Sequence, residues 1–229
     1  MSPDGQAILK SLGVVAAERE KRRQSPALAE RVVELKRYQH ARFEHTYGDL
    51  LASARYAKAA RFFLEDLYGP RDFTARDDQF ARIVPGLVRL FPASIVATVR
   101  QLGELHALSE EMDTQMATFF ETVPLDAATY GRIWRSTGRA ADRERQIVLM
   151  SAVGAALDRY TRNPLLRNSL RLMRGPAKAA GLWALHQFLE NGFDTFGAMG
   201  GASGFLGTIE MRERALAQRL FDGGSPDLA

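Results

Sequence analysis

Apolar residues recur at helical spacing along nearly the whole chain, and this periodicity constrains the fold more than any other feature. In residues 25–51, leucine, valine and aromatic side chains recur at roughly helical spacing, after Ser25 as a predicted N-cap and Pro26 at the first helical position. No segment shows the regular alternation of apolar and polar residues that indicates a strand. We therefore expect an all-α fold.

Prolines and glycines mark the predicted helix ends. Gly69-Pro70, Pro85 and Pro92 predict breaks, and a long helix is expected over residues 93–120. The chain contains no internal repeat and no low-complexity linker. We expect a single-domain bundle of roughly eight to ten helices. The expected organisation is an N-terminal helical arm over residues 1–24, a helical-bundle domain over residues 25–221 and a disordered tail over residues 222–229.

Composition excludes several kinds of chemistry. The 229 residues include no cysteine, which excludes disulfides, thiolate metal sites and cysteine nucleophiles and is compatible with a cytoplasmic protein. No stretch approaches the roughly 18 uncharged apolar residues that a spanning helix needs, so no membrane partner is expected. The net charge is only +4, and the basic cluster "EREKRRQ" is short and contains two glutamates. Nucleic acid is therefore not an expected partner.

Standard catalytic and nucleotide-binding motifs are absent from the sequence. There is no G-x-x-x-x-G-K-[ST] loop, no G-x-G-x-x-G turn, no G-x-S-x-G elbow and no H-E-x-x-H helix. The paired Glu-x-x-His signature of di-iron bundles is also missing. The sequence therefore specifies no cofactor and leaves open whether the protein is an enzyme.

Three of the four histidines are followed by a glutamate four residues later. On a helix these side chains are neighbours, and imidazole nitrogen with carboxylate oxygen suits zinc, iron or manganese. The same spacing also produces weak surface ion pairs that need no ligand. The candidate metal ligands are these three pairs and one nearby aspartate: His40, Glu44, His106, Glu110, Asp113, His186 and Glu190.

His106, Glu110 and Asp113 form the most specific candidate site. They stand at i, i+4 and i+7 in "LHALSEEMD", and the spacing places His106 and Asp113 within an apolar helix face. A buried carboxylate is costly without a partner, so an arginine, a metal or water must face these groups. We expect an arginine as the default partner of these groups, and the alternatives are a ligand pocket or a metal ion. The candidate arginines are Arg61, Arg82, Arg100, Arg143, Arg159 and Arg171.

The block "RYAKAARFFLEDLYGPRDFTARDDQFARIVPGL", followed by "LHALSEEMD", resembles a family of bacterial helical proteins of unknown function. The resemblance extends from about Tyr38 to Leu220, and "FFLEDLYGP" is its most specific part. It implies a bacterial, helical, single-domain protein. It implies no activity and supplies no functional residue.

We expect a cytoplasmic helical-bundle protein that binds a partner protein or a small ligand without catalysis. The alternative is a metal- or haem-dependent enzyme or sensor, with His106 or His186 as the axial ligand if haem is bound. Amphipathic bundle helices are also compatible with a homo-oligomer. Regulatory nucleic-acid binding through arginine-rich faces is a third hypothesis.

Overall fold

The computed structural model describes residues 2–67, 73–121 and 124–226. All regular secondary structure in these residues is helical, with twelve α-helices, one π-helical turn and no strand. The expected all-α single domain is confirmed. The helix number exceeds the expected range because α3, α4 and α10 have only five or six residues, which is too short for periodicity to reveal.

The helices follow one another with short connections. Their bounds are α1 Pro3–Gln24, α2 Pro26–Thr46, α3 Gly48–Ala52, α4 Ala57–Phe62, the π-helical turn η1 Phe63–Leu67, α5 Thr74–Leu90, α6 Ala93–Ala117, α7 Ala127–Thr137, α8 Ala140–Thr161, α9 Pro164–Leu172, α10 Arg174–Ala179, α11 Trp183–Ala198 and α12 Ser203–Phe221.

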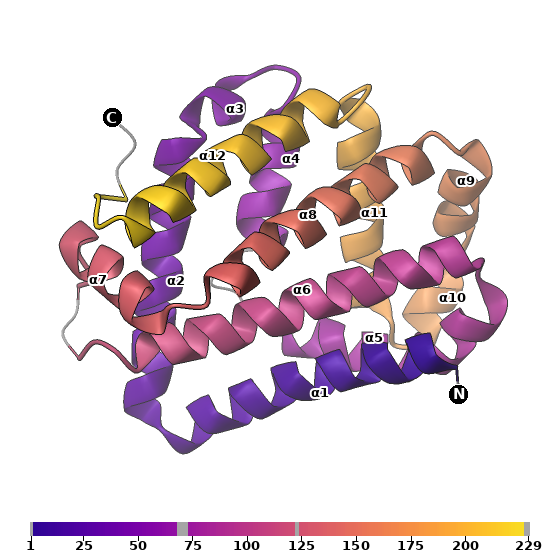
Figure 1. The fold of residues 1–229 in the computed structure, drawn as a ribbon. Helices are drawn as coiled ribbons and strands as arrows, with labels where there is room; N and C mark the ends of the chain where they lie inside the picture. The colour runs from indigo at the N-terminus through magenta and orange to yellow at the C-terminus, as the bar shows by residue number, and fades with distance from the viewer. Residues whose placement is uncertain (1, 68–72, 122–123, 227–229) are drawn as a thin grey trace.

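Four long helices lie side by side in the order α1, α6, α8 and α12 (Figure 1). One face of this layer is covered by helices α2, α4, α5 and α11, and α2 crosses the layer near one end (Figure 1). Helix α6 is central because it contacts α1, α2, α7 and α8. A residue on the inner face of α6 is therefore surrounded by helices that are distant in sequence.

The core consists of three groups of packed apolar side chains. One group, which includes Phe63, Phe196 and Phe205, joins α4 and η1 to α8, α11 and α12. A second surrounds Trp134 and joins α2, α6, α7 and α12. The third includes Ile8 and joins α1 to α5 and α6. Helix α1 is therefore packed against the bundle along its length, although the sequence analysis describes it as an arm.

Two helix boundaries differ from the expected ones. Pro85 lies inside α5, which continues to Leu90. A proline inside a helix costs about 3 kcal/mol, and the packing of Val84 and Leu87 against α1 and α6 offsets that cost. Helix α6 ends at Ala117, three residues before the expected end. The expected N-cap at Ser25 is confirmed, because its hydroxyl accepts a hydrogen bond from the Leu28 N–H.

Two predicted segments are only partly described. Residues 68–70 of the "FFLEDLYGP" block, which include the predicted break at 69–70, lie outside the described residues, and 63–67 form η1. In the predicted tail, the Gly224 N–H donates to the carbonyl oxygen of Arg219 at 2.8 Å, and residues 227–229 lie outside the described residues. Among the described residues, no helix has the length and apolarity needed to cross a bilayer.

The core assignment makes a prediction for two leucines. Leu35 has no exposed surface, whereas Leu165 is 74% exposed. Leu35→Ala is expected to lower the free energy of unfolding by about 2–5 kcal/mol, because it removes buried methyl groups and leaves a cavity. The matched substitution Leu165→Ala is expected to change it by about 0.5 kcal/mol or less. Urea denaturation checks both, and similar losses for the two variants would contradict this core.

Candidate functional site

His106, Glu110 and Asp113 lie in the wall of one internal cavity of about 380 Å³. The cavity lies between α5, α6, α8, α9 and α11, and residues of these helices form most of its wall. The wall is predominantly apolar; among its members are Phe80, Leu102, Leu157, Leu170, Phe188 and Phe193. The polar residues Lys36, Gln39, Asp77 and Arg76 also line the cavity. The predicted trio therefore belongs to the polar part of a mainly apolar cavity.

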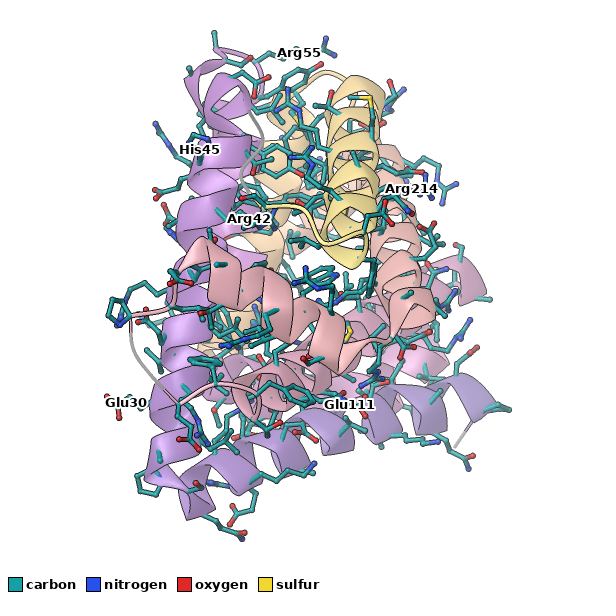
Figure 2. All side chains as sticks on the ribbon, turned by 60° about the vertical axis from the view of Figure 1, so that its left-hand side comes forward. Glu30, Arg42, His45, Arg55, Glu111 and Arg214 are labelled. Carbon is teal, nitrogen blue, oxygen red and sulfur yellow. The ribbon has the colours of Figure 1, made fainter. Side chains whose placement is uncertain are left out.

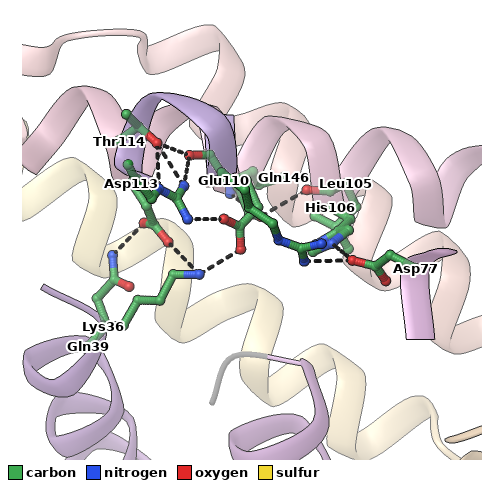
Figure 3. Close-up of polar contacts among 12 residues, drawn as sticks. Lys36, Gln39, Asp77, Leu105, His106, Glu110, Asp113, Thr114 and Gln146 are labelled. Atoms are coloured by element: carbon green, nitrogen blue, oxygen red, sulfur yellow. Dashed lines mark hydrogen bonds and ion pairs between the residues drawn. The ribbon is translucent and has the colours of Figure 1, made fainter. Parts of the chain in front are cut away.

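Glu110 is held by two cations from other helices. Its carboxylate accepts a hydrogen bond from Arg22 Nη1 of α1 at 2.5 Å and from Lys36 Nζ of α2 at 2.6 Å (Figure 3). Arg22 also donates to the hydroxyl of Thr114 and to the carbonyl oxygen of Glu110. Burial alone would raise the pKa of Glu110, but the charges of Lys36 and Arg22 lower it to about 2. Glu110 is therefore ionised and fully paired.

Asp113 is much less well compensated. Its Oδ1 accepts a hydrogen bond from Gln39 Nε2 at 3.0 Å, and its Oδ2 lies 4.0 Å from Lys36 Nζ (Figure 3). Burial raises the pKa of Asp113 above its ordinary value, and Lys36 offsets this only in part. Of the two carboxyls in the trio, Asp113 is therefore the one whose pKa is raised rather than lowered.

His106 is paired with Asp77 of α5 rather than with Glu110. The distance between His106 Nε2 and Asp77 Oδ2 is 2.9 Å (Figure 3). Asp77 also accepts from Arg19 Nη2 at 2.7 Å and from Arg76 Nε at 3.2 Å. Although burial raises the pKa of Asp77, the hydrogen bond and charge of His106 together with the two arginines hold it well below its usual range. Helices α1, α5 and α6 are thereby joined at this point.

The other two histidine–glutamate pairs lie elsewhere. His40 Nδ1 is 3.7 Å from Glu44 Oε2, and neither residue lines the cavity. His186 is buried against Trp183, with its Nε2 3.5 Å from Glu190 Oε2. The three pairs therefore do not converge.

The structure lends the metal hypothesis no support. Within the described parts of the chain, no three histidine, aspartate or glutamate side chains are grouped so as to hold a metal ion. The metal and haem alternatives stay predictions.

Most of the charge that compensates the buried carboxylates does not come from the expected arginines, although the charge of Arg143 lowers the pKa of Asp113. The trio does have an arginine partner, as expected, but this partner is Arg22, which pairs with Glu110 together with Lys36. Arg100 pairs with Asp4 instead, and Arg82 donates to the carbonyl oxygen of Gly181. The periodicity shows which residues share a helix face but not which helices cross that face, so the expected arginines did not include Arg22.

The sequence analysis missed Lys36, Gln39 and Asp77, in addition to Arg19, Arg22 and Arg76. A signal for the first two exists in the sequence, because Val32, Lys36, Gln39 and Phe43 share one helix face by spacing. Val32 and Phe43 are buried, so the two polar residues interrupt an apolar stripe. Such an interruption indicates a buried polar partner across the helix interface. Asp77 carries no comparable signal, because an acidic residue in a first helical turn is common.

A second, smaller cavity of about 100 Å³ lies on the other side of Asp113. Its wall includes Arg42, Arg143 and Glu213. Arg42 points inward from α2 to Glu213 of α12 at 3.0 Å, whereas Glu30 of the same helix projects into solvent (Figure 2). The guanidinium of Arg143 lies 3.9 Å from the ring centroid of Trp134, and burial lowers its pKa. Asp113 therefore lines both cavities.

The paired state of Glu110 predicts a pH-dependent stability. Glu110→Gln is expected to lower the free energy of unfolding at neutral pH by on the order of 3 kcal/mol, because two buried cations lose their partner. The folded-state pKa is depressed, so this difference is present above 4.5 and lost as pH falls towards about 2. Denaturation at several pH values checks it. Glu111→Gln, on the half-exposed neighbour, is the control, and an equal loss there would contradict the assignment.

Substitution of Asp113 is predicted to change the stability in the opposite direction from substitution of Glu110. Its folded-state pKa is raised, so the stability that it contributes is present below its ordinary value of 3.8 and lost as pH rises through the folded value. Asp113→Asn keeps the acceptor for Gln39 and removes this loss. We expect the variant to be as stable as the parent at acidic pH and more stable at neutral pH. Parallel denaturation curves check this, and a variant that is less stable at neutral pH would contradict it.

Comparison with known proteins gives a family but no activity. A family model for a domain of unknown function, DUF8198, matches residues 18–227, a range that contains the predicted region of resemblance. No curated protein and no solved structure matches the chain. The match begins inside α1 just before Arg19 and Arg22, so it includes every residue of the polar network described above. The chain belongs to the DUF8198 family of uncharacterised domains.

Proposed function

We propose that this protein binds a small amphipathic molecule, with the apolar part of the ligand in the cavity and its polar head at Lys36, Gln39 and Asp113. One observation carries the proposal: a cavity of about 380 Å³ has a mainly apolar wall and a polar group of residues in one part of it. This is the composition typical of ligand pockets, which have apolar walls and a few polar groups that orient the ligand.

The volume of the cavity is too large to be ordinary packing imperfection. Protein interiors contain few voids larger than a water molecule, and this cavity, which is open to solvent beside the exposed Phe91 and Met173, costs free energy because it leaves apolar wall in contact with water. A ligand that fills the cavity recovers that cost. Since a cavity of about 150 Å³ holds benzene, this one corresponds to on the order of 15 non-hydrogen atoms. A medium-length aliphatic chain with a small head has this size.

The charges of the network favour an anionic head. Four cations, Arg19, Arg22, Lys36 and Arg76, face three carboxylates, those of Asp77, Glu110 and Asp113. Of these cations, Lys36 lines the cavity with its ammonium group 2.6 Å from Glu110 Oε1 and 4.0 Å from Asp113 Oδ2. Lys36 Nζ and Gln39 Nε2 are donors on the cavity wall. A carboxylate head that accepts from both fits this charge, so we infer a medium-chain carboxylic acid as the ligand class.

Titration with dodecanoate tests the proposal. At about 100 times its dissociation constant, a ligand of the folded state adds about 2.7 kcal/mol, which raises the melting temperature by on the order of 5–10 °C. Neutral 1-dodecanol is expected to give a smaller rise, because it lacks the charge that Lys36 recognises. Calorimetry and thermal unfolding measure both. No change with dodecanoate would refute the proposed ligand class.

Cavity-filling variants locate the binding site. Val99 lines the cavity, and Val99→Trp is expected to abolish the dodecanoate effect by occupying the space. Val148→Trp is the control, because Val148 is exposed on α8 and does not line the cavity. Leu102→Phe, also in the wall, provides a second filled cavity if the larger substitution prevents folding. If a variant with a filled cavity folds and still binds dodecanoate as strongly as the parent protein, the ligand does not bind in this cavity.

A further inference from the structure

The apolar cavity reaches the molecular surface at one corner. Phe91, Met173 and Leu189 all line the cavity, yet each is also exposed to solvent, Phe91 by 47% and Met173 by 51%. They belong to the turn between α5 and α6, the junction of α9 with α10, and α11. In Figure 1 the α5–α6 turn, α9 and α10 lie together at the right-hand end of the molecule. We call this region the cavity mouth.

Two hydrogen bonds hold the elements of the cavity mouth together. The hydroxyl of Tyr160, at the end of α8, lies 2.9 Å from the carbonyl oxygen of Ser94 at the start of α6. Arg82 of α5 donates to the carbonyl oxygen of Gly181, just before α11, at 3.0 Å. Helices α9 and α10 lie between these two attachments in the chain, so the structure fixes them beside the α5–α6 turn.

Helix α9 extends the apolar wall of the cavity out into solvent. Leu166, Leu170 and Met173 stand at i, i+4 and i+7 and line the cavity. Leu165 and Leu172 are seven residues apart and therefore share one face, and they are 74% and 79% exposed. At about 100° per residue the two sets lie on neighbouring parts of the helix surface, with Ser169 between them. No residue of α9 is buried, so the part of this surface that carries Leu165 and Leu172 has no protein partner within the described residues.

The same corner is strongly basic. From residue 159 to residue 189 the chain has six basic residues and no acidic one. Three of these six are paired with carboxylates: Arg162 with Asp158, Arg167 with Asp194 and Arg174 with Glu190. Arg171 and Lys178 are exposed on α9 and α10, and Arg89 is exposed at the end of α5 beside the exposed Leu90. Exposed leucines surrounded by basic side chains are the pattern of a surface that lies in the interface of an anionic bilayer.

We propose that the cavity mouth docks on an anionic membrane surface, so that an aliphatic carboxylic acid passes between the bilayer and the cavity without crossing water. The proposal deepens the function above and rests on it for the identity of the ligand. Leu165 and Leu172 insert between lipid headgroups, and the basic side chains contact the headgroup phosphates. The sequence analysis expected no membrane partner because no helix can span a bilayer, but surface docking needs no spanning helix.

A second copy of the chain fits this surface less well. A two-fold dimer formed through the cavity mouth would place Arg171, Arg174 and Lys178 of one copy against the same residues of the other. The like charges would repel, and the apolar mouth of each cavity would be closed. Charge complementarity therefore favours lipid phosphates over a second basic surface.

Vesicle flotation tests the docking. Vesicles of equal parts phosphatidylcholine and phosphatidylglycerol are expected to bind the protein, and vesicles of phosphatidylcholine alone are expected to bind it at least about tenfold more weakly, because each basic residue is attracted to the anionic surface. Raising the salt concentration should weaken binding, since it screens this attraction. Equal binding to both vesicle types, or none to either, would overturn the proposal.

Paired variants locate the surface. Leu165→Ser with Leu172→Ser, and separately Arg171→Glu with Lys178→Glu, are each expected to reduce vesicle binding by on the order of tenfold or more. All four positions are exposed, so the fold should persist, as circular dichroism will show. The matched controls are Val148→Ser with Met211→Ser on α8 and α12, and Arg23→Glu with Arg132→Glu. Equal losses in variants and controls would overturn the assignment of this surface.

Two further measurements separate this proposal from the function of the cavity. Dodecanoate titration without vesicles reports on the cavity alone; if dodecanoate binds and vesicles do not, docking is refuted and the proposed function stands. If vesicles bind and dodecanoate does not, the ligand class is refuted and docking stands. Sedimentation of the free protein completes the test, because self-association that the leucine variants abolish would identify a second copy as the occupant and overturn membrane docking.

Discussion

The buried Glu110 carboxylate, held by Arg22 and Lys36, is the interaction on which the rest of the site depends. It joins three helices, α1, α2 and α6, whose residues are up to 88 positions apart in sequence. A buried charge without a partner costs several kcal/mol, so the two cations and the carboxylate must come together as the helices pack. Because Arg22 also bonds the Glu110 carbonyl oxygen, the position of α1 along α6 is fixed at the same point. The apolar contacts alone would leave that register less well defined.

This fixed polar junction explains how the bundle sustains a large cavity beside it. Helix α6 is anchored to α1 by Arg22 and, through Asp77, to α5, so the wall that carries the polar residues does not collapse inward. The opposite wall, formed by α9 and α11, is less constrained, because α9 has no buried residue. One side of the cavity is thus rigid and polar, and the other is apolar and close to solvent. That asymmetry suits a ligand whose head is recognised and whose chain enters past α9.

The sequence predicted the fold class and the helix face on which His106 and Asp113 lie, but not the residues that contact them from other helices. Helical spacing was sufficient to place His106 and Asp113 on an inner face, since periodicity along α6 is a local property. The identity of Arg22, Lys36 and Asp77 as partners depends on how α1, α2 and α5 cross α6, which no local pattern encodes. Pro85 shows the same limit. A proline normally ends a helix, but tertiary packing allows α5 to continue past it to Leu90. The cavity itself is an absence of packing, and a sequence contains no sign of it.

Asp113 connects the polar junction to both cavities. It lines both the large and the small cavity, and the Lys36 ammonium group lies 4.0 Å from it but only 2.6 Å from Glu110. A carboxylate ligand beside Lys36 would add a negative charge next to Asp113 and raise the pKa of that carboxyl further, since like charges disfavour ionisation. The pKa of Asp113 would therefore depend on the charge of a head bound beside Lys36, because a neutral head adds no such charge.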